Sequence, residues 1–259
     1  MTGWSGPRLA LGLLTVVPVG TPRTDRVSAR AAVLWMPAVG LALGLAVAAA
    51  LYGVRVLIGP APIFQGVLAV TLLVAATRAL HLDGLADTVD GLGSARPAGP
   101  ALEVMRRSDI GPFGVVALVL TMLLQAAALG DLVSEHRISS ALVTAVVAGR
   151  LTVVWACRRG VPAARSDGLG ALVAGTVPFP AAVVLTALVL AGAATAGWLD
   201  ESGGWRGVAF AAGAVLAALA VAGLLLRRCV RRFGGVTGDV LGACVEVGQT
   251  AALLVATAA

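Results

Sequence analysis

Residues 110–130 read IGPFGVVALVLTMLLQAAALG, a run of 21 positions without a charged side chain. Wound as an α-helix, such a run is about 31 Å long, which matches the hydrocarbon core of a bilayer. The whole chain has the same character, because 59% of its 259 residues are hydrophobic and only 12% are charged. Its mean hydropathy of +0.96 lies well above the values of soluble globular proteins. The sequence therefore predicts an integral membrane protein.

Six further apolar runs approach the length that a transmembrane helix needs. We therefore expect an all-α fold, a polytopic helical bundle of about seven transmembrane helices (six to eight) that forms a single membrane domain over residues 1–259. The N-terminal stretch Arg8–Gly20 is apolar but too short to cross, and we expect it to lie at the membrane interface. The six further runs are Ala31–Leu51, Pro62–Leu80, Ser139–Cys157, Ala181–Leu199, Gly207–Leu226 and Asp239–Ala259.

The positions of the arginines give an independent test of these spans. All 19 basic residues are arginine, and with a cytoplasmic N-terminus fourteen of them fall in cytoplasmic loops and three in outer loops. This is the bias of the positive-inside rule. We therefore expect the N-terminus and an active site formed by the loops 81–109, 158–180 and 227–246 to face the cytoplasm. The pI near 10.8 then reflects topology, and no nucleic-acid partner is expected.

Three aspartates stand close together in His81–Gly93, HLDGLADTVDGLG, directly after a predicted span. On a helix, Asp83, Asp87 and Asp90 share an arc of roughly 60°. Carboxylates this close repel one another unless a cation lies among them. Oxygen ligands of this kind suit Mg²⁺, completed by substrate phosphates and water. The alternative is a solvated acidic helix face, but the doubled Asp-Gly-Leu favours a magnesium site.

The loop at residues 105–114, MRRSDIGPFG, carries groups that suit phosphate binding. Arg106 lies beside the predicted start of a helix, which Ser108 or Asp109 would cap. An arginine beside a helix N-terminus can hold a phosphate. The alternative is an ordinary helix cap beside arginines that set the topology.

A third segment, residues 227–246, reads RRCVRRFGGVTGDVLGACVE. Four arginines lead into a glycine-rich turn whose backbone amides can approach an anion closely. Asp239 and Glu246 follow seven residues apart, on one face of the final predicted helix. Arginines, glycines and carboxylates are the parts that phosphoryl-transfer sites use. The alternative is a glycine-rich linker with topogenic arginines.

Two other positions are weaker candidates. Arg150 lies within a predicted span, where an arginine usually snorkels to the interface or pairs with an acid. Residues 167–170, Asp-Gly-Leu-Gly, follow Arg165 and form a weak candidate for a loop that contacts substrate.

Taken together, these segments resemble the cobalamin synthase family, the adenosylcobinamide-GDP ribazoletransferases. The resemblance implies an enzyme of the bacterial plasma membrane that joins adenosylcobinamide-GDP to α-ribazole, or to α-ribazole 5′-phosphate, in late vitamin B12 biosynthesis. GMP would be released and adenosylcobalamin, or its 5′-phosphate, formed, with Mg²⁺ as the cofactor. The segments that carry the resemblance are LTVVPVG at 14–20, HLDGLADTVDGLG at 81–93, MRRSDIGPFG at 105–114 and RRFGGVTGDVLGACVE at 231–246.

The resemblance also assigns roles to individual residues. The expected catalytic carboxylates are Asp83, Asp87, Asp90, Asp239 and Glu246, and the expected metal ligands are Asp83, Asp87, Asp90 and Asp239. The expected substrate-binding residues are Arg106, Arg150, Arg231, Arg232, Gly235 and Thr237. The chain departs from the family at two places, because Arg107 and Gln249 stand where relatives often have acids.

Two other classes of protein remain as alternatives. The CDP-alcohol phosphotransferases are also membrane proteins with an aspartate-rich metal motif, but their Asp-Gly-x-x-Ala-Arg start is not reproduced here. A cation-coupled transporter would distribute its acids through the depth of the membrane, whereas the candidate acids here cluster at one side. The expected partners are a corrinoid nucleotide, ribazole and the lipid bilayer, and the sequence leaves a homo-oligomer open.

Overall fold

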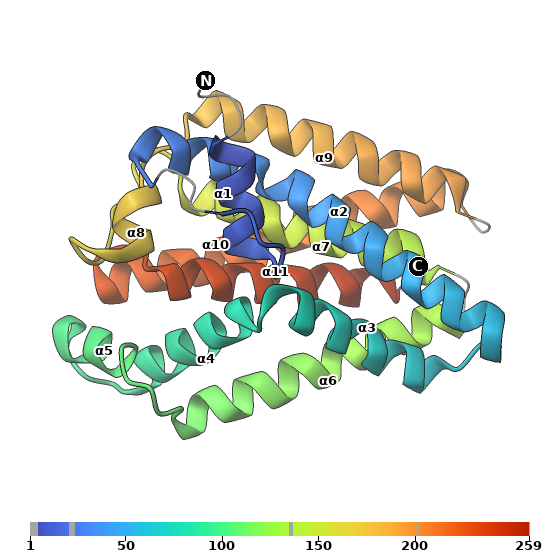
Figure 1. Ribbon diagram of the computed structural model, residues 1–259, viewed down its shortest axis with the longest axis horizontal. Coiled ribbons are helices and arrows are strands. Elements are labelled where there is room, and N and C mark those ends of the chain that lie inside the picture. Colours follow the sequence, from blue (N-terminus) through green and yellow to red (C-terminus); the bar gives the residue numbers. More distant parts are fainter. Residues whose placement is uncertain (1–4, 21–23, 135–136, 201–202, 259) are drawn as a thin grey trace.

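Long apolar helices dominate the fold (Figure 1). The computed structural model describes residues 5–20, 24–134, 137–200 and 203–258, and these residues form eleven helices and no β-strand. The all-α prediction is therefore confirmed. The helices are α1 (Ser5–Leu14), α2 (Arg26–Ile58), α3 (Pro62–Thr77), α4 (Leu80–Gly93), α5 (Ala98–Val104), α6 (Pro112–Ser134), α7 (Ile138–Ala156), α8 (Gly168–Val173), α9 (Phe179–Leu199), α10 (Gly204–Phe233) and α11 (Gly238–Ala256).

Among the described residues, six helices are long and apolar enough to cross a membrane, namely α2, α6, α7, α9, α10 and α11. The pair α3 and α4 passes the same test together but is bent by 91°, so the chain has six or seven candidate spans and the predicted number is confirmed. The run Pro62–Leu80 is not one straight helix, because Arg78 and Ala79 adopt left-handed conformations with φ of 55° and 56°. Two such residues in succession interrupt the helical hydrogen bonds, and α4 starts in a new direction.

Capping residues outside the apolar runs determine how far two of the long helices extend. Asp25 caps α2, since its carboxylate accepts hydrogen bonds from the amides of Val27 and Ser28 at 3.0 and 2.9 Å. Gly234, with φ of 84°, ends α10. As a result α2 and α10 have 33 and 30 residues and are longer than the predicted spans.

The N-terminal helix α1 packs across α2. Gly6 makes the close approach possible, because a Cβ at this position would lie 2.4 Å from the Cβ of Ala31. The buried side of α1 carries Leu9, Ala10 and Leu14. With ten residues α1 is too short to span a bilayer, as the sequence predicts, and its place at the membrane interface stays a prediction.

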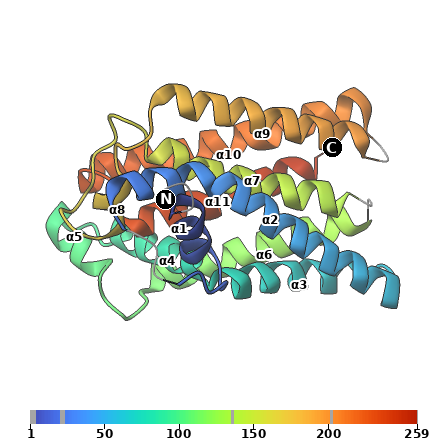
Figure 2. The ribbon, with the colours of Figure 1, turned by 45° about the horizontal axis from the view of Figure 1, so that its top comes forward.

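Helices α7 and α11 lie at the centre of the bundle (Figures 1 and 2). The apolar stretches of α7 and α11 are 72% and 67% buried, whereas that of α9 is 11% buried. The two central helices approach closely because a Cβ on Gly149 would lie only 2.9 Å from the Val245 carbonyl oxygen. The outer helices expose large apolar side chains such as Leu123 and Leu188, which suits a protein surrounded by lipid.

Replacing Gly66 by valine should force α3 away from α6, because a Cβ at this position would lie 2.2 Å from the Ala126 carbonyl oxygen. We expect Gly66→Val to lower the stability by about 1–3 kcal/mol, as overpacking usually does. The thermal midpoint of the purified protein in detergent measures this loss. The control is Gly53→Ala in α2, where a Cβ meets no heavy atom within 4 Å and the midpoint should hold or rise. An unchanged midpoint for Gly66→Val would contradict the packing.

Candidate active site

Helices α4 and α11 cross in backbone contact, and this crossing brings distant carboxylates together. A Cβ on Gly84 would lie 2.7 Å from the carbonyl oxygen of Asp239, and a Cβ on Gly242 would lie 3.2 Å from the Cα of His81. The first distance leaves no room for a side chain, and the second is tighter than most Cβ contacts, so each helix contributes one glycine to the contact. The contact places the aspartates of α4 beside Asp239 at the start of α11.

Three carboxylates gather at this crossing. Asp83 is exposed, while Asp87 and Asp239 are partly buried. The charges of Asp83 and Asp239 both act on Asp87, so the three groups repel one another. Among the described residues, however, no three His, Cys, Asp or Glu side chains come close enough to hold a metal ion by themselves. A cation here would need further oxygens from substrate and water, which is how Mg²⁺ is usually bound.

Asp90, the third aspartate of the motif, acts as a helix cap. Its carboxylate is buried and accepts hydrogen bonds from the amides of Gly111 and Gly114 at 2.8 and 2.9 Å, at the start of α6. Both glycines leave room for this carboxylate, because a Cβ at either position would lie 2.4 Å from one of its oxygens. The cap of α6 therefore comes from α4 and not from Ser108 or Asp109, the two residues that the sequence suggested.

A strap formed by residues 160–165 is fixed to the turn before α11. The amide of Val236 donates to the Pro162 carbonyl oxygen, and the amide of Ala164 donates to the Val236 carbonyl oxygen, both at 2.9 Å. A Cβ on Gly235 would lie 2.4 Å from the carbonyl carbon of Ala163, so glycine lets the two segments touch. In this structure Gly235 thus allows the strap to pack against the turn, and the strap places Arg165 beside the carboxylates.

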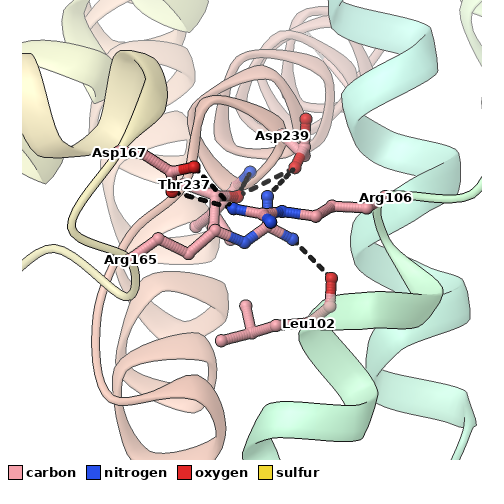
Figure 3. Close-up of polar contacts among 7 residues, drawn as sticks. Leu102, Arg106, Arg165, Asp167, Thr237 and Asp239 are labelled. Carbon is pink, nitrogen blue, oxygen red and sulfur yellow. Dashed lines mark hydrogen bonds and ion pairs between the residues drawn. The ribbon is translucent and has the colours of Figure 1, made fainter.

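Arg165 contacts two segments that are distant from it in sequence (Figure 3). Its Nη1 is 4.0 Å from Oδ2 of Asp239, and its Nη2 donates to the Leu102 carbonyl oxygen at 2.5 Å. Partial burial lowers the pKa of the Arg165 guanidinium, which nevertheless stays charged at neutral pH. Thr237 completes the group, because its hydroxyl donates to Asp239 at 3.1 Å and accepts from the Val240 amide at 3.2 Å.

Arg106 and Asp167 form an ion pair at the rim of the same group (Figure 3). Nη2 of Arg106 lies 2.8 Å from both carboxylate oxygens of Asp167, and the two side chains are 54% and 66% exposed. The sequence singles out Arg106, and Asp167 belongs to its weak candidate loop. Arg165 itself was not among the predicted site residues, since no motif surrounds it and only the fold places it beside Asp239.

A cavity of about 330 Å³ opens beside these groups. Its lining combines charged and polar residues with apolar side chains, some of which come from α1 and α2. The charged and polar residues include Asp83, Arg165, Asp167, Thr237 and Asp239, and the apolar ones include Leu13, Leu14, Met36, Val153 and Val245.

Two predicted site residues lie in the interior of the bundle and not in this cavity. Arg150 and Glu246 are 2% and 7% exposed. Nη1 of Arg150 donates to Gln249 at 2.6 Å, and Gln125 donates to Glu246 at 2.9 Å. Gln249 in turn donates to Gln125 at 3.3 Å, so the network joins α6, α7 and α11. Glu246 is about 10 Å along α11 from Asp239, as seven residues of helix require.

The two predicted arginines at the end of α10 also lie away from the carboxylates. The guanidinium of Arg232 donates to the Arg96 carbonyl oxygen. Arg231 lines a second cavity, between α7, α9 and α10. The structure therefore brings Asp83, Asp87, Asp239, Thr237 and Arg165 together, with Arg106 at the rim.

The fold and this cavity define a polytopic helical membrane protein whose acidic, arginine-flanked site suits phosphate chemistry. The chain belongs to the family described as cobalamin-5-phosphate synthase, which it matches over residues 6–257. The resemblance seen in the sequence is thereby confirmed.

Individual relatives match over nearly their whole length. A protein of Frankia casuarinae named adenosylcobinamide-GDP ribazoletransferase is 45% identical over 96% of this chain and 92% of its own. Relatives of the same name from Nocardioides sp. and Bradyrhizobium diazoefficiens are 45% and 38% identical, over 95% and 97% of this chain and 96% and 92% of their own. No solved structure matches the chain.

The cap formed by Asp90 can be separated from the exposed carboxylate of Asp83 by amide substitutions. Asp90→Asn would turn an NH₂ group toward one of two backbone amides and leave a buried donor unsatisfied. We expect a stability loss of about 1–3 kcal/mol, measured as a lower thermal midpoint in detergent. Asp83→Asn should hold or raise the midpoint, because this side chain is exposed and its charge repels the neighbouring carboxylates. Equal thermal midpoints for the two variants would contradict the assignment of Asp90 as the cap of α6.

Proposed function

We propose that this chain is an adenosylcobinamide-GDP ribazoletransferase whose reaction takes place in the cavity between α1, α4, α7 and α11. The observation that carries the proposal is the meeting of Asp83, Asp239 and Arg165 at one cavity, with Asp87 close enough to feel the charge of both aspartates, in a chain that is 45% identical to relatives of that name.

The chemistry is the displacement of GMP from a diphosphate. A ribose hydroxyl of the ribazole acceptor attacks the phosphorus that stays with cobinamide, and the bond from this phosphorus to the bridging oxygen breaks. GMP leaves with the bridging oxygen. A carboxylate at the α4–α11 crossing, either Asp87 or Asp239, accepts the hydroxyl proton. Arg165 neutralises charge that grows on the phosphate oxygens during the displacement.

The lining of the cavity suits parts of these substrates. Apolar side chains such as Leu14, Met36 and Val153 can take the flat aromatic base of ribazole. The diphosphate would lie beside Arg165 and the exposed Arg106, which provide positive charge. The carboxylates then face the bond that breaks.

We include Mg²⁺ in the proposal, because the donor set fits this ion. Asp83, Asp87 and Asp239 offer only carboxylate oxygens, and Mg²⁺ needs just one or two of these when phosphates and water complete its shell. When bound, the ion would polarise the diphosphate and stabilise the charge of the leaving GMP. Asp90 is left out of this set, because its oxygens are bonded to the start of α6.

The cytoplasmic location of the site is also part of the proposal. The positive-inside bias of the arginines supports it. Water-soluble nucleotide substrates would then reach the cavity from the compartment in which they are made.

The reaction can be tested with the full chain purified in nanodiscs, supplied with adenosylcobinamide-GDP and α-ribazole. We expect release of GMP with formation of a cobalamin product, and loss of both when EDTA replaces Mg²⁺. Asp87→Asn and Asp239→Asn should each lower the rate at least 10²-fold. The matched control is Asp131→Asn, an exposed carboxylate of α6 far from the cavity, which should keep full activity.

Well-folded protein that releases no GMP from these substrates would overturn the proposal. Turnover of a CDP-activated alcohol by the same protein would replace it with the phosphotransferase alternative. Full activity in EDTA would contradict the proposed role of Mg²⁺ and leave the rest of the proposal intact.

Arg165 should be as important as the carboxylates. We expect Arg165→Gln to lower kcat/KM by about 10²–10³-fold, the usual effect of losing one group that stabilises transition-state charge. Arg165→Lys should retain part of the activity, since it keeps the charge but not the planar donor geometry. The control is Arg107→Gln, which removes the exposed arginine next to Arg106 in the sequence. Wild-type rates in Arg165→Gln would show that the strap does not serve catalysis.

A further inference from the structure

Helices α9 and α10 form a hairpin that is closed at one end and open at the other. At the closed end Gly197 and Gly207 touch, since a Cβ on Gly197 would lie 2.3 Å from the Gly207 carbonyl oxygen. From this point the two helices diverge toward the end of the bundle that holds α5 and α8 (Figures 1 and 2). The start of α9 and the end of α10 are therefore well separated.

A cavity of about 840 Å³ lies in the open part of this hairpin, against α7. Its lining is largely apolar and includes Trp155 and Leu219. Three arginines, Arg158, Arg227 and Arg231, also line it. Along α10, Leu219 lies about 12 Å from Arg227, because eight residues of helix separate them. The cavity thus has a charged end and an apolar end.

The cavity carries positive charge without a matching acid. No Asp or Glu is among the described residues that line it. Of its arginines, Arg158 donates to the Trp155 carbonyl oxygen at 3.1 Å, and Arg227 and Arg231 are exposed. This contrasts with the cavity of the proposed active site, where Arg165 faces carboxylates. An anionic group would therefore be attracted to the charged end.

The cavity adjoins a surface that faces lipid. Helices α9 and α10 are candidate spans whose apolar stretches are only 11% and 22% buried. Phe179 and Leu224, which line the cavity from these two helices, are 58% and 64% exposed. In a bilayer, arginines at the end of a span lie at the depth of the headgroups, and the residues one or two turns inward lie among acyl chains.

The central helices separate this cavity from the proposed active site. On α11, Cys244 lines the hairpin cavity, whereas the next residue, Val245, lines the cavity with the carboxylates. On α7, Thr152 lines the hairpin cavity and Val153 lines the cavity with the carboxylates. A ligand in the hairpin cavity would therefore not contact the carboxylates.

We propose that the cavity between α7, α9 and α10 is a binding site for one anionic phospholipid of the phosphatidylglycerol type. Its phosphate contacts Arg158, Arg227 and Arg231, and an acyl chain lies along the apolar wall toward Leu219. Positive charge at headgroup depth selects the anionic headgroup, since each arginine favours an anionic lipid surface. The site fills a gap that the diverging helices leave within the membrane.

Tryptophan fluorescence can test the site, because Trp155 lines the cavity. The purified full chain in mixed micelles is titrated with phosphatidylglycerol, or with phosphatidylcholine, carrying brominated acyl chains that quench tryptophans in contact. The difference between wild type and Trp155→Phe isolates the signal of Trp155. We expect brominated phosphatidylglycerol to quench Trp155 at a mole fraction several-fold lower than brominated phosphatidylcholine. Native mass spectrometry of the wild type should show one phosphatidylglycerol retained in preference to phosphatidylcholine.

Two pairs of substitutions at the same end of the bundle separate a site from general charge attraction. Arg227→Gln with Arg231→Gln should reduce the preference for phosphatidylglycerol at least fivefold, roughly the effect of one arginine at an anionic surface. Arg159→Gln with Arg228→Gln removes the same charge from exposed residues that do not line the cavity, and the preference should persist. Equal quenching by both lipids, or an equal loss in both pairs, would overturn the proposal.

Discussion

The contact between the backbones of α4 and α11 is the constraint on which the site depends. Gly84 and Gly242 allow it, and a side chain at position 84 would force the helices apart. The contact joins residues more than 150 positions apart and sets carboxylates against one another at the edge of a membrane domain. Such a cluster is costly without counter-charge, which explains why Arg165 is brought there by the strap and why a cation fits the proposed reaction.

Much of the fold follows from local features of the sequence. Apolar runs of about 20 residues give the spans, and their number was predicted within the range that the structure shows. The spacing of Asp83 and Asp87 likewise predicts that they share a helix face. The bend after Thr77 was not predicted, because Arg78 and Ala79 are not residues that usually adopt left-handed conformations.

The rest of the site depends on contacts between distant segments, which periodicity does not reveal. Asp90 fits the same helical arc as Asp83, yet it faces the start of α6 and caps it. Arg165 has no motif around it and reaches Asp239 only because Gly235 fixes the strap. Arg231 resembles a phosphate ligand in sequence, but the length of α10 carries it to the lipid-facing side of the central helices.

The most direct test of this account is the rate of GMP release by Gly84→Ala. An added Cβ would lie 2.7 Å from the Asp239 carbonyl oxygen and push α4 off α11. Because misplacement of catalytic groups by about 1 Å can cost 10²-fold, the account predicts at least that loss in protein that still folds. Gly99→Ala in α5, where a Cβ meets no heavy atom within 4 Å, should behave as wild type. Wild-type turnover by Gly84→Ala would contradict the claim that this contact builds the site.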